Sequence, residues 1–262
     1  MTLRIRNLAS GSAGNATLVE VQGSVHTTRL LIDCGVRPAE LERRLQRCGL
    51  SITDLDALFV THEHSDHVGH ARPLAERHQI PVWMSDGTRR ACEAHTWAMP
   101  PGQLHMARDG ESVHIQDLCL HPFTVPHDAQ EPLQLRCTDG DRVLGVVTDL
   151  GHVSRHVTES LQRCHALFLE TNHEPEWVQR SSYPEFLKRR ILGDQGHLSN
   201  AQAAELLGQV RHDGLHTVIA AHLSERNNHP EQARATLSHV LGCQPQDVPV
   251  ADPTDGSNWF TV

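Results

Sequence analysis

A short segment in the first quarter of the chain gathers side chains that bind metal ions. It reads Thr61-His62-Glu63-His64-Ser65-Asp66-His67 and follows directly on the apolar run Leu58-Phe59-Val60. Imidazole and carboxylate groups together suit Zn, Mn or Fe. A solvated turn has no need of His-x-His-x-Asp-His spacing behind a buried strand. The segment therefore predicts a metal site at the end of a strand.

This segment resembles the H-x-H-x-D-H signature of the metallo-β-lactamase superfamily, and Leu30-Leu31-Ile32-Asp33-Cys34-Gly35 is similar to the Asp motif that precedes it there. The later ligands of that family are a His, an Asp and a His, each following a strand. The matching segments are Val125-Pro126-His127, Val147-Thr148-Asp149 and Ala220-Ala221-His222. The resemblance covers the whole chain. It implies an α/β (α+β) fold, an αββα sandwich of two mixed sheets flanked by helices, with a dinuclear site at one edge.

The resemblance also implies a role for each matched residue. One cation would be held by His62, His64 and His127, the other by Asp66, His67 and His222, with Asp149 bridging them. Two divalent ions a few ångströms apart lower the pKa of a shared water and clamp the attacking and leaving oxygens, so the machinery is hydrolytic. Asp33 is similar to a structural Asp of the family, better placed to orient a ligand-bearing loop than to bind metal.

Three more segments indicate a branch of the family. They are Glu170-Thr171-Asn172-His173, Gly196-His197-Leu198-Ser199-Asn200-Ala201-Gln202 and Ala221-His222-Leu223-Ser224-Glu225-Arg226-Asn227-Asn228. These look like the phosphodiesterase branch, in which tRNase Z-like enzymes pair a Glu and a His after the bridging Asp. Together with the loop Ser10-Gly11-Ser12-Ala13-Gly14-Asn15, they make the chain most similar to the YycJ/WalJ subfamily, described as DNA-directed exonuclease-like proteins.

His197 and Glu170 also have a chemical case of their own. The leaving alkoxide of a phosphodiester needs a proton, and an imidazole with a pKa of about 6.5 is a suitable donor if a carboxylate keeps it charged and oriented. We therefore assign His197 as general acid and Glu170 as its partner, and we count the metal ligand Asp66 in the catalytic set as well. The alternatives are an ordinary polar residue at a helix N-terminus for His197 and a structural acid for Glu170.

Candidate substrate contacts come from the same segments. They are Ser10, Ser12, Asn15, Asn172, Asn200 and Asn227. The backbone N–H groups of the loop from Ser10 to Asn15 could cradle a phosphate, or the loop could be a tight turn between strands. The basic run Lys188-Arg189-Arg190 could receive backbone phosphates, or it could be a solvated helix end. With 5 Phe, 4 Trp and 1 Tyr in the chain, extended base-stacking platforms are not expected.

The leading hypothesis is a dinuclear-metal-dependent phosphodiesterase or nuclease, exonuclease-like with DNA favoured, carrying two divalent ions, either Zn or Mn, with Fe also compatible. Hydroxide between the metals would attack phosphorus while His197 protonates the leaving group. The alternative is a thioester or lactone hydrolase of the glyoxalase II-like type, which shares the ligands and needs no general acid. A metal-stabilised scaffold without catalysis is a third hypothesis, against which the complete set of matched ligands argues.

The elements that must position these residues follow from periodicity. Alternation and short apolar runs predict strands over residues 3–6, 16–21, 30–32, 58–60, 82–84, 113–115, 120–125, 133–137, 144–147, 166–169 and 217–221. Amphipathic spacing predicts helices from 38 to about 48, 87–96, 157–163, 184–190, after Ser199, and 230–241. Ser199 and Gln202 have the spacing of a capping box. His70 is expected to be a helix or loop residue and not a ligand.

Composition limits the remaining choices. The 262 residues carry 23 Lys+Arg and 32 Asp+Glu, a net charge of -9 that argues against a nonspecific coat for polyanions. A chain of this length buries a full core, and only residues 150–221 separate Asp149 from His222, so we expect one domain over 1–262 without the insertion of the β-CASP nucleases. No run of about 18 apolar residues occurs and the start resembles no signal peptide, which leads us to expect a cytoplasmic protein without membrane contact.

The seven cysteines are scattered, with no C-x-x-C pair, and are expected to be reduced thiols used in packing. The sequence carries no signal for an oligomeric state.

Overall fold

A computed structural model describes residues 1–95 and 98–262. Its strands form one sheet in the order β13-β1-β2-β3-β4-β5-β6 and a second in the order β12-β11-β10-β9-β8-β7. Both sheets are mixed. Neighbouring strands are parallel from β3 through β4 and β5 to β6 and from β10 through β11 to β12, and all other pairs are antiparallel. The strands are β1 Thr2–Ala9, β2 Ala16–Gln22, β3 Thr27–Ile32, β4 Ala57–Phe59, β5 Val82–Met84, β6 Leu104–Met106, β7 Val113–Ile115, β8 Leu118–Thr124, β9 Leu133–Thr138, β10 Val143–Val147, β11 Ala166–Glu170, β12 Thr217–Ala221 and β13 Phe260–Thr261.

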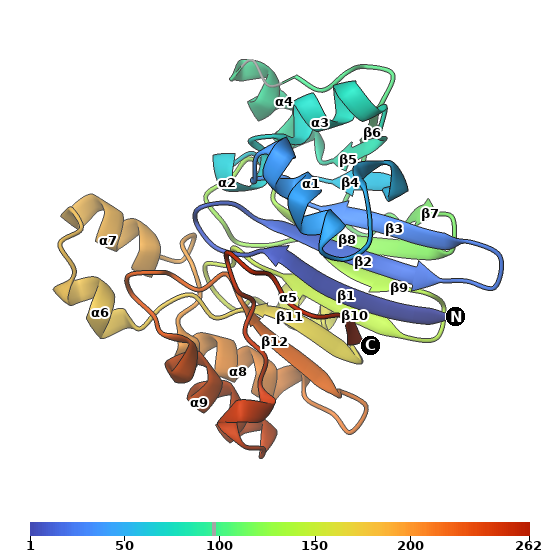
Figure 1. The fold of residues 1–262 in the computed structure, drawn as a ribbon. Helices are drawn as coiled ribbons and strands as arrows, with labels where there is room; N and C mark the ends of the chain where they lie inside the picture. Colours follow the sequence, from blue (N-terminus) through green and yellow to red (C-terminus); the bar gives the residue numbers. More distant parts are fainter. Residues whose placement is uncertain (96–97) are drawn as a thin grey trace.

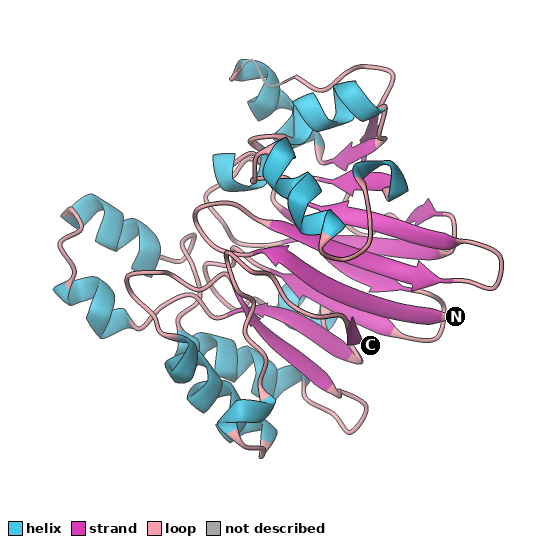
Figure 2. Cartoon of the chain, in the orientation of Figure 1, coloured by secondary structure: helices cyan, strands magenta, loops and turns pink. Residues whose placement is uncertain are grey.

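The helices cover the outer faces of the two sheets. Figure 2 shows the strands in the middle of the molecule with helices on either side. The α-helices are α1 Pro38–Gln46, α2 Ser65–Val68, α3 Ala71–His78, α4 Asp86–Ala94, α5 Arg155–Ser160, α6 Pro175–Arg180, α7 Glu185–Leu192, α8 Asn200–Val210 and α9 Pro230–Leu241, and two short 3-10 helices span Ile52–Asp54 and Pro245–Asp247. The arrangement is the αββα sandwich that the resemblance implied.

Continuous apolar runs form strands that are buried on both faces. Side chains alternate across a strand, so in β3 Leu30 and Ile32 enter the core between the two sheets while Leu31 enters the core under α1, α3 and α4. In β11, Phe168 lies between the sheets and Leu167 packs in a third core with α5, α8 and α9. Three apolar layers therefore hold four layers of secondary structure together.

The strands bring their carboxyl ends to one edge of the sandwich. β3 and β4 run parallel, as do β10, β11 and β12, and β8 has the same direction as β10 because both are antiparallel to β9. The segments that follow these six strands carry the polar residues singled out from the sequence. Side chains far apart in the chain thus gather at one place.

A helical hairpin, defined here as residues 174–196 with α6 and α7, joins β11 to α8. Figure 1 shows α6 and α7 standing away from the body of the sandwich, at the left of the view. The two ends of the hairpin are held together by a parallel bridge between His173 and Ser199, and by hydrogen bonds from Asn172 N to Leu198 O and from Asn200 N to His173 O. The hairpin therefore rises from a fixed base.

Most predicted elements occur with boundaries shifted by a few residues. The predicted capping box is present, since Ser199 Oγ accepts from Gln202 N at 3.2 Å and Gln202 Oε1 accepts from Ser199 N at 2.9 Å. The helix predicted over 87–96 ends at Ala94, and residues 96–97 lie outside the described part of the chain. The elements β6, β13, α2, α3 and α6 were not predicted from the sequence.

The cysteines behave as packing residues in the fold. All seven are free, and Cys34, Cys92, Cys137 and Cys164 are buried. Burial raises the pKa of the Cys34 thiol to about 12, with a smaller contribution from the charge of Asp33. In the described part of the chain, no helix combines the length and the apolar character needed to cross a bilayer.

Candidate metal centre

Three residues of the site adopt a left-handed backbone where a strand ends. Asp33 follows β3 with a φ of 63°, Asp149 follows β10 with a φ of 56°, and His222 follows β12 with a φ of 52°. This conformation is uncommon for residues other than glycine, and it concentrates where structure fixes a functional side chain. Each turn directs the chain sharply out of the sheet at the common edge.

Asp33 lies beneath the histidine-rich segment and holds it from both sides. Its Oδ1 accepts a hydrogen bond from Thr61 N at 2.8 Å, and its Oδ2 lies 2.8 Å from Nδ1 of His67. Thr61 Oγ1 also contacts the carboxylate and stands 3.0 Å from Nδ1 of His62. Asp33 thereby orients the ring of His67, so that Nε2 faces the centre of the cluster.

The first group of candidate ligands consists of His62, His64 and His127. Nε2 of His62 lies 3.0 Å from Nδ1 of His64, and Nε2 of His127 lies 3.3 Å from the same atom. Nδ1 of His127 is 2.9 Å from the carbonyl oxygen of Gly196, a contact that fixes the tautomer and leaves the Nε2 lone pair for a cation. Burial lowers the pKa of His62 and of His127, which favours the neutral imidazole that metal binding requires.

The second group consists of Asp66, His67 and His222, and Asp149 lies between the two groups. Oδ2 of Asp149 is 3.1 Å from Nε2 of His67 and 3.4 Å from Nδ1 of His222. Its Oδ1 is 3.9 Å from Nε2 of His127, on the side of the first group. Burial by itself raises the pKa of the Asp149 carboxyl, but His222 and His67 hold that pKa well below its usual range. One carboxylate thus presents an oxygen to each group.

The donor set fits divalent cations. In each of the two groups the possible ligand atoms lie within 4.8 Å of one another. Asp149 Oδ2 and His222 Nδ1 are buried and have no hydrogen-bond partner among the described residues. Buried polar atoms are rarely left unpaired, and a cation between these two atoms would satisfy both. Nitrogen and carboxylate donors in this combination match Zn, Mn and Fe.

His197 and Glu170 form a pair beside this cluster. Nδ1 of His197 lies 2.8 Å from Oε1 of the fully buried Glu170 and 3.7 Å from Oδ1 of Asp149. The other oxygen of Glu170 accepts hydrogen bonds from the backbone N–H groups of Leu150 at 2.8 Å and Leu198 at 3.1 Å. Burial lowers the pKa of His197, but the charge and hydrogen bond of Glu170 outweigh that effect and raise the pKa to about 9.

The cluster opens into a cleft of about 250 Å³. The cleft is lined by Ser12, His64, Ser65, Asp66, Asp149, Arg190, His197 and His222. Arg190 is the one Arg or Lys among these described lining residues, and it forms an ion pair with the carboxylate of Asp128. Asp128 directly follows His127 but was not predicted as a site residue, and Arg190 was considered only as part of the basic run that could receive phosphates or be a solvated helix end. His70 belongs to neither ligand group and directly precedes α3.

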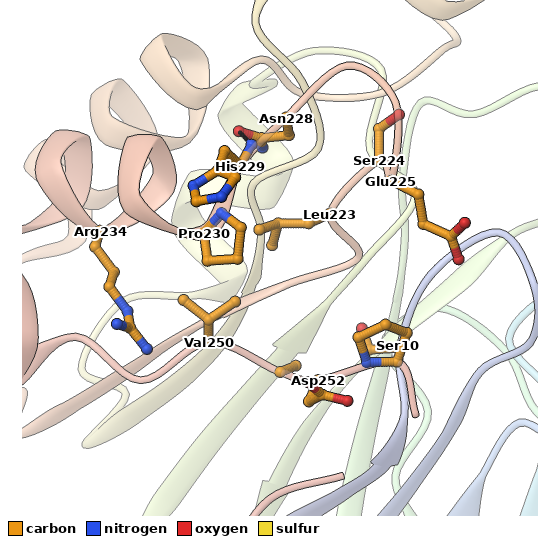
Figure 3. A pocket seen from close by; sticks show the side chains of 12 residues that line it. Ser10, Leu223, Ser224, Glu225, Asn228, His229, Pro230, Arg234, Val250 and Asp252 are labelled. Atoms are coloured by element: carbon orange, nitrogen blue, oxygen red, sulfur yellow. Dashed lines mark hydrogen bonds between the residues drawn. The ribbon is translucent and has the colours of Figure 1, made fainter. Parts of the chain in front are cut away.

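The loop from Ser10 to Asn15 supports the site more than it lines it. Ser10 Oγ accepts a hydrogen bond from His222 N at 2.8 Å, and Asn15 donates through Nδ2 to the carbonyl oxygen of Asp66 at 3.2 Å. Ser10 also lines a separate pocket, which Figure 3 shows with Leu223 and Asp252. Of the three side chains of this loop that were proposed as substrate contacts, Ser12 alone lines the cleft.

The other three asparagines proposed as substrate contacts are buried and hydrogen-bonded within the protein. Asn172 donates through Nδ2 to the carbonyl oxygen of His222 at 2.7 Å, and Asn200 donates to Asn228 Oδ1 at 2.9 Å. Asn227 Nδ2 lies 3.4 Å from Ser224 Oγ. Their exposed fractions of 4%, 1% and 1% leave no surface for a substrate. The loops that carry them need internal donors and acceptors, and these amides supply them.

The fold and the two ligand groups together define a class of metal-dependent hydrolases. The model of the family described as "Beta-lactamase superfamily domain" matches residues 28–223. The chain belongs to the β-lactamase superfamily, and it is a metal-dependent hydrolase with the metallo-β-lactamase fold.

Named relatives resemble nearly the whole chain. Exodeoxyribonuclease YycJ of Bacillus anthracis is 34% identical over 241 residues, 92% of this chain and 90% of the relative. Exodeoxyribonuclease WalJ of Streptococcus pneumoniae is 31% identical over 236 residues, 89% of this chain and 86% of the relative. The crystal structure of the metallo-β-lactamase fold protein YhfI from Bacillus subtilis superposes with a TM-score of 0.74 at 14% identity, covering all of both chains, which supports the fold alone.

Proposed function

We propose that the protein is a two-metal phosphodiesterase that removes nucleotides from the end of a nucleic acid strand, with DNA as the favoured substrate. The observation that carries the proposal is the pair formed by His197 and Glu170 beside Asp149, with Nδ1 of His197 2.8 Å from Oε1 of Glu170. Hydrolysis of a thioester needs no such donor, because a thiolate leaves without protonation. A phosphodiester releases an alkoxide, which does need a proton.

Each residue of the site has a part in this reaction. His62, His64 and His127 would hold one cation, Asp66, His67 and His222 the other, and Asp149 both. When bound, two divalent cations supply an activated water and neutralise charge on the phosphate. His197 acts as the imidazolium, with a proton on each ring nitrogen: Oε1 of Glu170 accepts the hydrogen bond of Nδ1–H, and Nε2–H is the group that gives its proton to the leaving oxygen. Zn and Mn are the cations we propose, and the names of the two curated relatives support DNA as substrate.

A substrate panel tests the proposal. Protein supplied with Zn or with Mn is assayed on bis(p-nitrophenyl) phosphate, on end-labelled duplex DNA and RNA, and on a thioester, and bound metal is measured on the same samples. We expect turnover of the diester and stepwise shortening of labelled DNA. Metal-loaded protein that cleaves neither phosphodiester contradicts the proposal.

The variant His197→Ala separates phosphodiester from thioester chemistry. Loss of the general acid is expected to lower kcat on the phosphodiester by about 10²–10⁴-fold with the metal content unchanged. His239→Ala, which changes an exposed histidine on α9, is the matched control. If His197→Ala retained full phosphodiesterase activity, the proton would have to come from another group and the assignment would be wrong.

A further inference from the structure

Exposed apolar side chains are concentrated on the hairpin of residues 174–196. Among the described residues, the large apolar side chains that are exposed are Met1, Val25, Met106, Trp177, Phe186 and Leu192, so half of them lie on this hairpin. None of the eight described residues of α7 is buried, and Phe186 is 70% exposed. A helix without a buried face gains little from packing on its own protein, and such a surface indicates a partner.

Aromatic residues are also concentrated here. The hairpin contains Trp177, Tyr183 and Phe186, three of the ten aromatic residues in a chain with 5 Phe, 4 Trp and 1 Tyr. Arg226 stands over the ring of Tyr183 with its guanidinium carbon 5.8 Å from the ring centre. The hairpin therefore offers a small set of aromatic side chains on which a base could stack.

Positive charge lies on the same side of α7 as the exposed ring. Phe186, Arg189 and Arg190 are spaced i, i+3 and i+4, so they share one face of the helix. Residues 186–193 carry three cations, between Glu185, which pairs with Lys188 at 3.1 Å, and Asp194, so Arg189 and Arg190 supply the positive charge of this face. Arg190 lines the cleft itself, where the carboxylate of Asp128 holds its guanidinium. The face thus runs from an exposed aromatic ring to the mouth of the cleft.

We propose that this face of α7 binds the unpaired end of the nucleic acid strand being degraded, with Phe186 stacking on a base and Arg189 and Arg190 receiving phosphates. The inference rests on the proposed function and extends it by naming the surface that grips the strand next to the scissile bond. A ring and cations on one face recognise a base and its phosphate together, and aromatic stacking needs a base free of its own duplex neighbours. An acidic protein binds a polyanion only where cations are gathered, as they are here.

The test measures binding without cleavage. A short fluorescein-labelled oligothymidylate is titrated in EDTA with wild-type protein and with Phe186→Ala, Phe186→Trp and Arg189→Gln, followed by fluorescence anisotropy. Loss of the stacked ring is expected to raise Kd about tenfold, whereas Phe186→Trp retains affinity. Arg189→Gln is expected to weaken binding and to reduce its dependence on salt. Val25→Ala changes an exposed apolar residue in another part of the chain and leaves Kd unchanged.

Two results would overturn the inference. One is an unchanged Kd for Phe186→Ala. The other is a wild-type dimer that Phe186→Ala converts to a monomer without loss of oligonucleotide affinity, measured by light scattering, because the face would then bind a second copy of the chain. Wild-type protein is also assayed on bis(p-nitrophenyl) phosphate with Mn. If the protein hydrolyses this diester and either result is obtained, the binding role of α7 is contradicted and the proposed phosphodiesterase activity is not.

Discussion

At the scale of single residues, the site depends on acceptors that lie behind the candidate ligands. Asp33 and Glu170 each use one carboxylate oxygen to orient an imidazole, that of His67 or of His197. The other oxygen of each accepts a backbone hydrogen bond, from Thr61 N to Asp33 and from Leu150 N to Glu170. Glu170 in particular receives N–H groups from the residue after Asp149 and the residue after His197. The positions of these two functional groups are therefore coupled through one carboxylate.

Replacing Asp33 tests this support. Asp33→Asn keeps the size of the side chain and its tolerance of a positive φ, but it removes the charged acceptor for Nδ1 of His67. Loss of such a partner is expected to lower metal affinity by about 10–100-fold, measured by competition with a chromophoric chelator. Asp141→Ala removes an aspartate whose side chain is 93% exposed and serves as the control. Equal affinity for metal in both variants would contradict an orienting role.

The candidate ligands were predictable because their types and spacing stand directly behind apolar strands. The substrate contacts were less so. Asn172, Asn200 and Asn227 lie close to the site in sequence, but whether an amide faces a cleft or the interior depends on loop packing that spacing does not encode. Arg190 presents the opposite case, since its place in the cleft follows from the path of the hairpin, which no local pattern reveals.

At the scale of elements, the turns at the ends of the strands determine where the candidate ligands lie. The turn after β3 and the helix α2 touch so closely that Gly35 has no room for a side chain. A Cβ at this position would stand 1.8 Å from the carbonyl oxygen of Asp66, and Gly35 N also donates to Asn15 O at 2.9 Å. The metal-binding segment is thereby seated against the loop from Ser10 to Asn15.

Gly35→Ala should separate these two segments. We expect a loss of stability of about 1–3 kcal/mol, because the new methyl group meets backbone atoms that cannot rotate away. Metal binding should weaken as well, since Asp66 is displaced. Urea denaturation and metal titration measure the two effects. Gly102→Ala, where nothing lies within 4 Å, is the control, and a Gly35→Ala protein as stable as Gly102→Ala would refute the close contact.

Elements with a clear period or a continuous apolar run were predicted, including the three-residue strands β4, β5 and β7, whereas the eight-residue helix α3 and the shorter elements β6, β13, α2 and α6 were not. β13 has two residues and α2 has four, too few to display a period. β13 exists because Phe260 and Thr261 pair with Ile5 and Arg4 of β1, a contact between the two ends of the chain. Such pairing is a property of the tertiary fold, and propensity along the chain gives no sign of it.

At the scale of the whole molecule, the two sheets meet at the candidate metal centre. One set of candidate ligands follows strand β4 of one sheet: His62, His64, Asp66 and His67. The other set follows strands β8, β10 and β12 of the second sheet: His127, Asp149 and His222. Cations bound between them would tie the two halves of the sandwich together. Binding to the folded state alone raises the free energy of unfolding, because the unfolded chain does not assemble the site.

Removal of metal is therefore expected to lower Tm. A site filled at 100 times its Kd contributes about 2.7 kcal/mol, which corresponds to a change on the order of 5–10 °C in a chain of this size. Calorimetry of the same sample with EDTA and with Zn or Mn measures the shift. His127→Ala should show a smaller shift than wild type. An identical Tm with and without metal would mean that the cluster does not bind cations in the folded protein.

The pinned base of the hairpin has a consequence for how this scaffold could be altered. The bridge between His173 and Ser199 joins the two ends of the hairpin. Glu170, which precedes the hairpin, and His197, which directly follows it, are therefore held by contacts at this base. We therefore expect that the segment from α6 through α7 can be replaced while this base keeps its structure. A segment of different length or charge would change which polymers reach the cleft, and Glu170 and His197 would keep their positions.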